Sequence, residues 1–349
     1  MPKSQESPDF KAIRHNSATW PLTLSPLRLI KFAMSITYRR LPFLIVHMTL
    51  ALLCLGLTGC GLTVRQRAAI SKFSTTTTAL AGQMEDNLVQ TRDDVVALYT
   101  GMFELGITGV ELDDLDKGLN VDQLEKRLKA AAALKRFGLL LETLSKDTQT
   151  AELQAASDKF VTSLRQVSNV NLSDKDAEAI GKLMGKVGGL FIEAKRKKAI
   201  KSVILESKLP LLKLADLVAD DFNPTNALWL AVLIDADRSI KTTVRDRAPR
   251  VAAGKLKSSE GDDKWGESEA AAWQDRYKML RIDSSDRSTR GVLVSKKMLS
   301  AIESFRTAHE DLFVVVQSPE ISLGKIDGYY AEIDSLIRLT RILTVKERK

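Results

Sequence analysis

Apolar residues between positions 70 and 102 recur at alternating steps of three and four, the spacing of one face of an α-helix. With two threonines in the same series, they are Ile70, Phe73, Thr77, Leu80, Met84, Leu88, Thr91, Val95, Leu98 and Met102. A seam of this kind is typical of a helix that packs against other helices. The pattern therefore predicts a long amphipathic helix over this segment.

The same periodicity continues after position 120. Asn120 and Gln123 form a capping-box pattern that predicts the start of a second helix. The pattern breaks at 146–150 and then resumes as a third helix. A longer candidate covers 173–209, and Pro210 should kink or end it.

The C-terminal half also reads as helix. The apolar run 227–234 is too short to span a bilayer and predicts a central buried helix. A glycine-rich polar segment, 247–269, predicts a flexible loop, followed by a short helix at 270–282. Two long helices should then form an antiparallel hairpin around Ser318 and Pro319.

These patterns predict an all-α fold, an elongated bundle of long antiparallel helices with no significant sheet. No segment of period two bounded by turn residues competes with the helical pattern. We expect 60–246 to form one helical region, and 270–349 to pack into the same bundle beyond the loop.

The first 60 residues follow a different pattern. Arg39 and Arg40 precede an apolar stretch, 41–57, which ends in Leu57-Thr58-Gly59-Cys60. A basic start, an apolar core and a small-residue cleavage site are the layout of a secretory signal. The last four residues resemble the lipobox of bacterial lipoproteins. That resemblance implies cleavage between Gly59 and Cys60, a diacylglycerol on the Cys60 thiol and a fatty acyl chain on the new N-terminus.

An uncleaved membrane helix is the alternative interpretation of 41–57. The stretch lies at the lower limit of spanning length and contains Pro42 and His47. Its exit also lacks the aromatic or basic anchors usual at a membrane interface. We therefore interpret 34–59 as a signal peptide that starts at Met34. Residues 1–33 are then a misassigned start or a dispensable leader.

Removing this signal changes the charge balance. The full chain has 52 Lys and Arg against 44 Asp and Glu, a net charge of +8. Seven of those bases and two of those acids precede Cys60, which leaves 45 against 42. This small excess does not indicate a nucleic-acid partner, and an exported protein would not meet one.

Few residues remain for catalytic or redox chemistry. Cys54 lies within the signal, so Cys60 is the remaining cysteine and an intramolecular disulfide is excluded. His309 is the only histidine after the signal, which argues against a Ser-His-Asp triad or a multi-histidine zinc site. We expect no cofactor.

Three features of the sequence are candidate binding sites: a basic group, a tryptophan and an acidic group. The acidic group is a weak candidate for calcium. Five bases could meet lipid headgroups, peptidoglycan or an acidic protein, or could simply be solvated: Lys195, Arg196, Lys197, Lys198 and Lys201. Trp265 could contact carbohydrate or protein. Four acids occupy ligand positions of an EF-hand loop: Asp114, Asp116, Asp122 and Glu125. Leu119 replaces the glycine of that motif, which favours an ordinary acidic loop over a metal site.

The pattern therefore favours a non-enzymatic structural or protein-interaction role in the cell envelope. The helices would be tethered to the membrane by the Cys60 lipid and would present their faces to a protein or cell-wall partner. A carboxylate-based envelope enzyme such as a glycan hydrolase, or an inhibitor or immunity-type lipoprotein, remain alternatives. The residue after Cys60 is Gly61, and not the aspartate that usually retains lipoproteins in the inner membrane. In this respect the chain resembles lipoproteins of the outer membrane, where it would face the periplasm.

We predict that the mature protein begins at Cys60. Mass spectrometry of the protein from native membranes should find an N-terminal peptide that starts with a triacylated Cys60. Cys60→Ser should leave the signal uncleaved, because the processing peptidase requires the lipid-modified thiol. A mature N-terminus at any other residue would contradict the interpretation of the signal.

Overall fold

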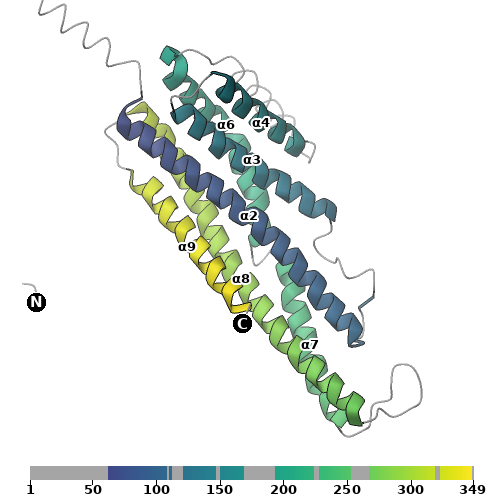
Figure 1. Cartoon of the computed structure of the whole chain (residues 1–349). Helices are drawn as coiled ribbons and strands as arrows, with labels where there is room; N and C mark the ends of the chain where they lie inside the picture. Colours follow the sequence, from purple (N-terminus) through teal and green to yellow (C-terminus); the bar gives the residue numbers. More distant parts are fainter. Residues whose placement is uncertain are drawn as a thin grey trace, which may run out of the picture. The chain divides into compact units, whose positions relative to one another are not determined.

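The computed structural model describes residues 62–107, 110–111, 121–146, 150–168, 193–223, 228–252, 267–318 and 323–347. The chain divides into two compact units, Met1–Cys60 and Gly61–Lys349, and the described residues all belong to the second. Their helices are α2 (Val64–Glu104), α3 (Val121–Ser145), α4 (Thr150–Ser168), α6 (Glu193–Phe222), α7 (Leu228–Ala252), α8 (Glu267–Gln317) and α9 (Gly324–Glu347). The described residues contain no strand (Figure 1). The predicted all-α helical bundle is confirmed.

Helix α2 begins at a capping box directly after the first described residue. The Thr63 hydroxyl accepts a hydrogen bond from the Gln66 backbone N–H, and the Gln66 side chain accepts one from the Thr63 N–H. The buried Gln66 amide also donates to the carbonyl oxygens of Val315 and Val316, at 2.9 and 3.1 Å. The first turn of α2 is thereby joined to the last turns of α8.

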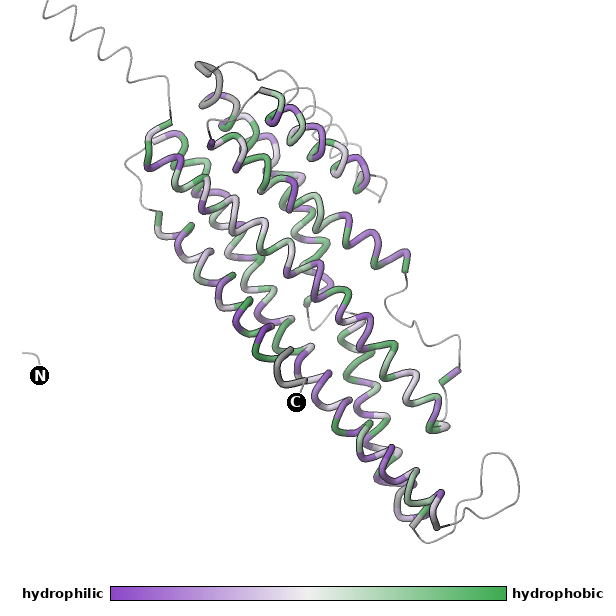
Figure 2. Tube along the Cα trace, in the orientation of Figure 1, coloured by the Kyte–Doolittle hydropathy of each residue, from purple (hydrophilic) through white to green (hydrophobic). Residues whose placement is uncertain are grey.

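The apolar seam predicted for α2 is buried along its whole length, which confirms the prediction. The threonines in this helix do not disturb it, because their hydroxyls bond within the helix. Thr76 and Thr77 donate to the carbonyl oxygens of Lys72 and Phe73, one turn earlier. Along the helices, hydrophobic and hydrophilic residues alternate as expected where one face of each helix is buried (Figure 2).

Helix α2 contacts α3, α7, α8 and α9, whereas α4 packs on α3 and lies outermost (Figure 1). Helix α3 approaches α2 closely at Gly138. A Cβ added there would lie 2.8 Å from the Ser74 carbonyl oxygen and 2.5 Å from the Thr78 hydroxyl oxygen. Only a residue without a side chain therefore fits at this crossing.

Helix α8 has 51 residues, which makes it about 75 Å long at 1.5 Å per residue. Its C-terminal half packs against α6, and Glu310 forms an ion pair with Lys208 at 2.9 Å. Its N-terminal half packs against α7, where the Ser284 hydroxyl donates to Asp237 at 2.9 Å. Helices α6 and α7 therefore follow one another along the same long helix.

The last two helices are antiparallel, as predicted. Lys325 in the first turn of α9 pairs with Asp311 late in α8, and Glu332 further along α9 pairs with Lys297 earlier in α8. The predicted boundary between a short helix at 270–282 and a separate long helix was wrong. The two are one continuous helix, because residues on both sides of that boundary pack against α7.

Three further local predictions are narrowed or corrected. Pro210 was predicted to kink or end its helix. It does not end the helix, because α6 continues through it to Phe222, and 173–192 lies outside the described residues. Contacts with α8 on both sides of Pro210 offset the cost of its missing N–H. Helix α7 continues to Ala252, so the start of the predicted 247–269 loop is helical.

The third correction concerns the apolar run 227–234, which is not buried on every side. Trp229, Leu230 and Leu233 are buried, but Ala231 is exposed and Ile234 is half-buried. One face of α7 packs against α8 and α2, while the other remains at the surface. The hydrophobicity of the run did not show whether the helix is buried on one face or on all faces.

A buried ion cluster links the middle of α2 to α8. Asp94 is 3% exposed and accepts hydrogen bonds from Arg287, Arg290 and Gln90. Arg287 also bonds both carboxylate oxygens of Asp283 at 2.8 Å. This pairing satisfies the one fully buried carboxylate of α2 and fixes the register of the two helices.

We predict opposite effects for two Gly→Ala substitutions. Gly138→Ala should lower the free energy of unfolding by about 1–2 kcal/mol, because the new Cβ overlaps the Ser74 carbonyl oxygen. Gly82→Ala should raise it by up to about 1 kcal/mol, because nothing lies within 4 Å of the added Cβ and alanine favours helix. Urea titration of both variants measures this difference. Equal effects would contradict the close crossing of α2 and α3.

Candidate functional site

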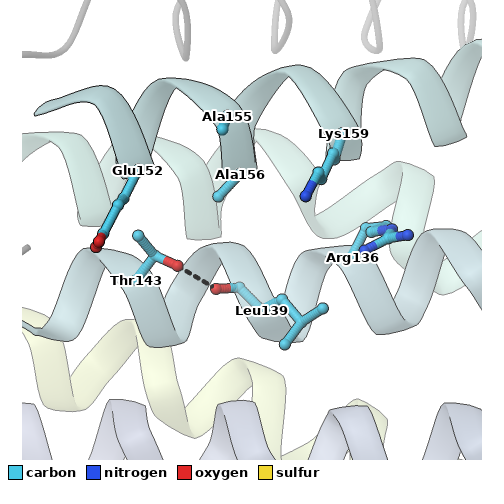
Figure 3. Close-up of a pocket in the computed structure, with 7 residues that line it drawn as sticks. All are labelled: Arg136, Leu139, Thr143, Glu152, Ala155, Ala156 and Lys159. Atoms are coloured by element: carbon cyan, nitrogen blue, oxygen red, sulfur yellow. Dashed lines mark hydrogen bonds between the residues drawn. The ribbon is translucent and has the colours of Figure 1, made fainter.

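A groove of about 290 Å³ lies between α3 and the outermost helix, α4. Figure 3 shows its seven lining residues, which are Arg136, Leu139, Thr143, Glu152, Ala155, Ala156 and Lys159. The same two helices contact one another through Phe137 and Phe160, whose ring centroids are 5.7 Å apart. Two of the lining residues are alanines, whose small side chains leave room for the groove.

The charged side chains of the groove are separated by sign. Arg136 from α3 and Lys159 from α4 lie toward one end, and Glu152 extends toward α3 at the other (Figure 3). Glu152 and Lys159 are seven residues apart on one helix, which is about 10 Å along its axis. Each of these three side chains is exposed, and none forms an ion pair with another described residue.

The remaining polar group of the groove is Thr143, whose hydroxyl donates to the Leu139 carbonyl oxygen at 2.8 Å. The groove therefore offers two cations at one end, one carboxylate at the other and a mainly apolar floor. It can bind a molecule that carries complementary charges about 10 Å apart. It does not provide the two facing carboxylates that a glycan hydrolase uses.

His309 lies in the core and not at the surface. The ring is 2% exposed, and its centroid lies 6.0 Å from those of Phe73 and Phe137 and 6.2 Å from that of Phe305. Its Nε2 has no hydrogen-bond partner. Burial, assisted by the charge of Lys208, lowers the pKa of His309 to about 4. The imidazole is therefore a neutral core group without access to a substrate.

Five of the residues singled out from the sequence lie outside the described part of the chain. These are Gly59, Cys60, Asp114, Asp116 and Trp265. The calcium hypothesis is therefore untested, although its two other residues are visible on α3. Asp122 is exposed, and Glu125 pairs with Lys129 at 2.8 Å, which lowers the pKa of Glu125. Among the described residues no group of acids, histidines or cysteines could hold a metal ion.

The basic group at the start of α6 is only partly described. Lys195, Arg196 and Lys197 lie on the helix, but their side chains are outside the described part. Lys198 is exposed and Lys201 is half-buried. Across the described ranges, no helix is long and apolar enough to cross a membrane.

Comparison with protein-family models, curated proteins and solved structures found no match for this chain. The site is therefore argued from its own geometry. Sequence reasoning missed the groove because its charged residues occupy ordinary exposed helical positions. The one sequence signal is the repeated seven-residue spacing, Arg136 to Thr143 and Glu152 to Lys159, which places each pair on one helix face.

We predict that His309 makes the protein less stable in acid. With a folded pKa of about 4 and an ordinary value of 6.5, the unfolded chain binds a proton that the folded chain does not. Stability should therefore fall as the pH drops from about 6.5 to 4, and the loss should reach about 2–3 kcal/mol. Urea titrations at pH 7.5 and 4.5 measure it.

The matched variant is His309→Leu, which removes the titrating group from the core. The carboxylates titrate in both proteins, so the comparison is between the two pH dependences and not between absolute stabilities. The variant should lose about 2 kcal/mol less than the wild type between the two pH values. Parallel profiles would contradict a buried, neutral His309.

Proposed function

We propose that this chain is a lipid-anchored protein of the cell envelope whose helical unit binds another protein and catalyses no reaction. The lipobox-like sequence ending at Cys60 supports the anchor. Gly61 supports a position in the outer membrane, facing the periplasm. The groove between α3 and α4 is the surface that we assign to the partner.

The three unpaired charges of the groove carry this proposal. Some neighbouring charged residues are neutralised locally, as Lys135 is by Glu85 at 2.7 Å and Lys146 by Glu142 at 2.5 Å. Arg136, Lys159 and Glu152 are not paired with any described residue. Charges of this kind steer and select a partner more than they tighten its binding.

The separation of charge in the groove indicates which charged side chains the partner carries. An acidic side chain would face Arg136 and Lys159, and a basic one would face Glu152. Two such residues seven positions apart on a helix are separated by the same distance of about 10 Å. An amphipathic helix laid along the groove would meet both ends, and its apolar side chains would contact Leu139 and the two alanines.

The structure gives less support to the enzymatic alternative. A hydrolase acting through two carboxylates needs them about 5–10 Å apart across a cleft. The groove contains one carboxylate, and its two cations lie at the opposite end. The one histidine of the described helices is buried. Binding therefore accounts for this surface better than acid–base chemistry does.

Site-directed photo-crosslinking in native envelopes tests the proposal. A photoreactive amino acid replaces Ala151, an exposed residue next to Glu152 in the first turn of α4. It should give one discrete protein product. Reversing the groove charges with Arg136→Glu and Lys159→Glu should reduce the yield by about tenfold, because both cations would become repulsive to the partner's acid.

The matched control reverses two exposed lysines outside the groove, with Lys126→Glu and Lys278→Glu. This double variant has the same net charge change and should keep the full yield. A yield that falls equally in both double variants would reflect net charge alone and would overturn the assignment of the groove. So would the absence of any discrete product from wild-type cells.

A further inference from the structure

The folded unit begins almost directly after the cysteine that we propose to be lipidated. Leu62 is already part of the core, at 9% exposure, and Thr63 caps α2. One residue, Gly61, therefore separates Cys60 from the buried chain. From Cys60 to Thr63 the chain can span about 10 Å. A lipid on Cys60 would thus hold the start of α2 within that distance of the membrane surface.

Several helix ends share this position, and we call them the anchor end. They are the first turns of α2 and α9, the described start of α6 and the last turn of α8, which Figure 1 shows at the same end of the helical unit. Gln66 joins α2 to α8, and Lys325 joins α9 to α8. The ion pair of Lys208 with Glu310 directs the preceding turns of α6 toward the end of α8.

The anchor end carries exposed basic groups and one strongly exposed apolar residue. Val64 is 86% exposed in the first turn of α2, and Arg65 beside it is also exposed. On α6, Lys198 is exposed and Lys201 is half-buried. Basic side chains together with an exposed apolar residue are the composition of a surface that contacts anionic lipid headgroups.

Two of the acids at the anchor end are paired with lysines. Asp327 pairs with Lys72 at 2.6 Å, and Asp311 pairs with Lys325 at 3.2 Å. Glu152, in the first turn of the neighbouring α4, is an exposed acid without such a pair among the described residues. Arg65 and Lys198 are exposed and form no ion pair with another described residue, so their charge is available to a negatively charged surface.

We propose that the anchor end lies against an anionic membrane surface, with α2 and α8 leading away from it. This inference rests on the proposed lipid at Cys60 and goes beyond it, because a lipid on a long spacer would leave the orientation of the protein undefined. The one-residue spacer limits the distance between the start of α2 and the membrane surface. The basic groups and Val64 determine which face of the protein is turned toward the membrane. The middle of α8 and the α7–α8 contact then lie away from the membrane.

The lipidated protein allows a direct test, because its one native cysteine carries the lipid and an introduced cysteine is the single site for a label. Gln317→Cys places a fluorophore at the anchor end, and Met279→Cys places it at an exposed position 38 residues earlier on α8, roughly 57 Å away. The protein is reconstituted in vesicles that contain phosphatidylglycerol and a lipid with a nitroxide on its headgroup. The label at 317 should be quenched, and the label at 279 should not.

Charge reversal separates the basic face from the tether. The tether keeps residue 317 near the membrane in either case, so the readout is the preference for 317 over 279. Arg65→Glu with Lys198→Glu should reduce that preference by raising the quenching at 279, as should vesicles of phosphatidylcholine alone. Reversal of two exposed arginines on α7 and α8, Arg245→Glu with Arg276→Glu, should leave quenching unchanged. Equal quenching at 317 and 279, or quenching unaffected by the first pair, would overturn the proposal.

The two proposals fail in different ways. If mass spectrometry finds no lipid on Cys60 and the protein stays in solution, the anchor itself is wrong. If Cys60 is acylated and the protein is bound to vesicles, but the label at 317 is not preferentially quenched, the anchor stands and the orientation is wrong.

Discussion

The buried seam of α2 is the surface on which the helical unit is assembled. Its apolar residues recur from Ile70 to Met102 in a helix of 41 residues, which contacts α3, α7, α8 and α9. Two features limit how its neighbours can lie. Gly138 admits the backbone of α3 at close range, and Gln66 fastens the start of α2 to the carbonyl oxygens of α8. Tyr329 of α9 adds a bond to Thr77, inside the same seam.

The length of α8 follows from this arrangement. A helix of 51 residues exceeds what its own side chains would stabilise, because isolated helices gain little without tertiary packing. Here α6 covers one half and α7 the other, while Asp94 on α2 holds Arg287 and Arg290 near the middle. The long helix therefore has a buried face from Tyr277 onward, to which α2, α6, α7 and α9 all contribute.

This scaffold places two surfaces with different chemistry on one helical unit. The anchor end gathers basic side chains where α2 begins, and the groove between α3 and α4 separates positive from negative charge. The first would face lipid and the second a protein. Helix α4 packs only on α3 among the main contacts, so a partner can approach the groove from outside without disturbing the core around α2.

Periodicity alone determined the helical class and the buried residues of α2, since the spacing of apolar positions reflects helix geometry directly. It could not predict that α6 passes through Pro210, or that α8 is continuous past residue 282. Both depend on neighbours that are distant in the sequence and supply packing where local propensity is weak. The groove was hidden for the same reason. Arg136, Glu152 and Lys159 are ordinary exposed residues until α3 and α4 are brought side by side, and only the tertiary structure does that.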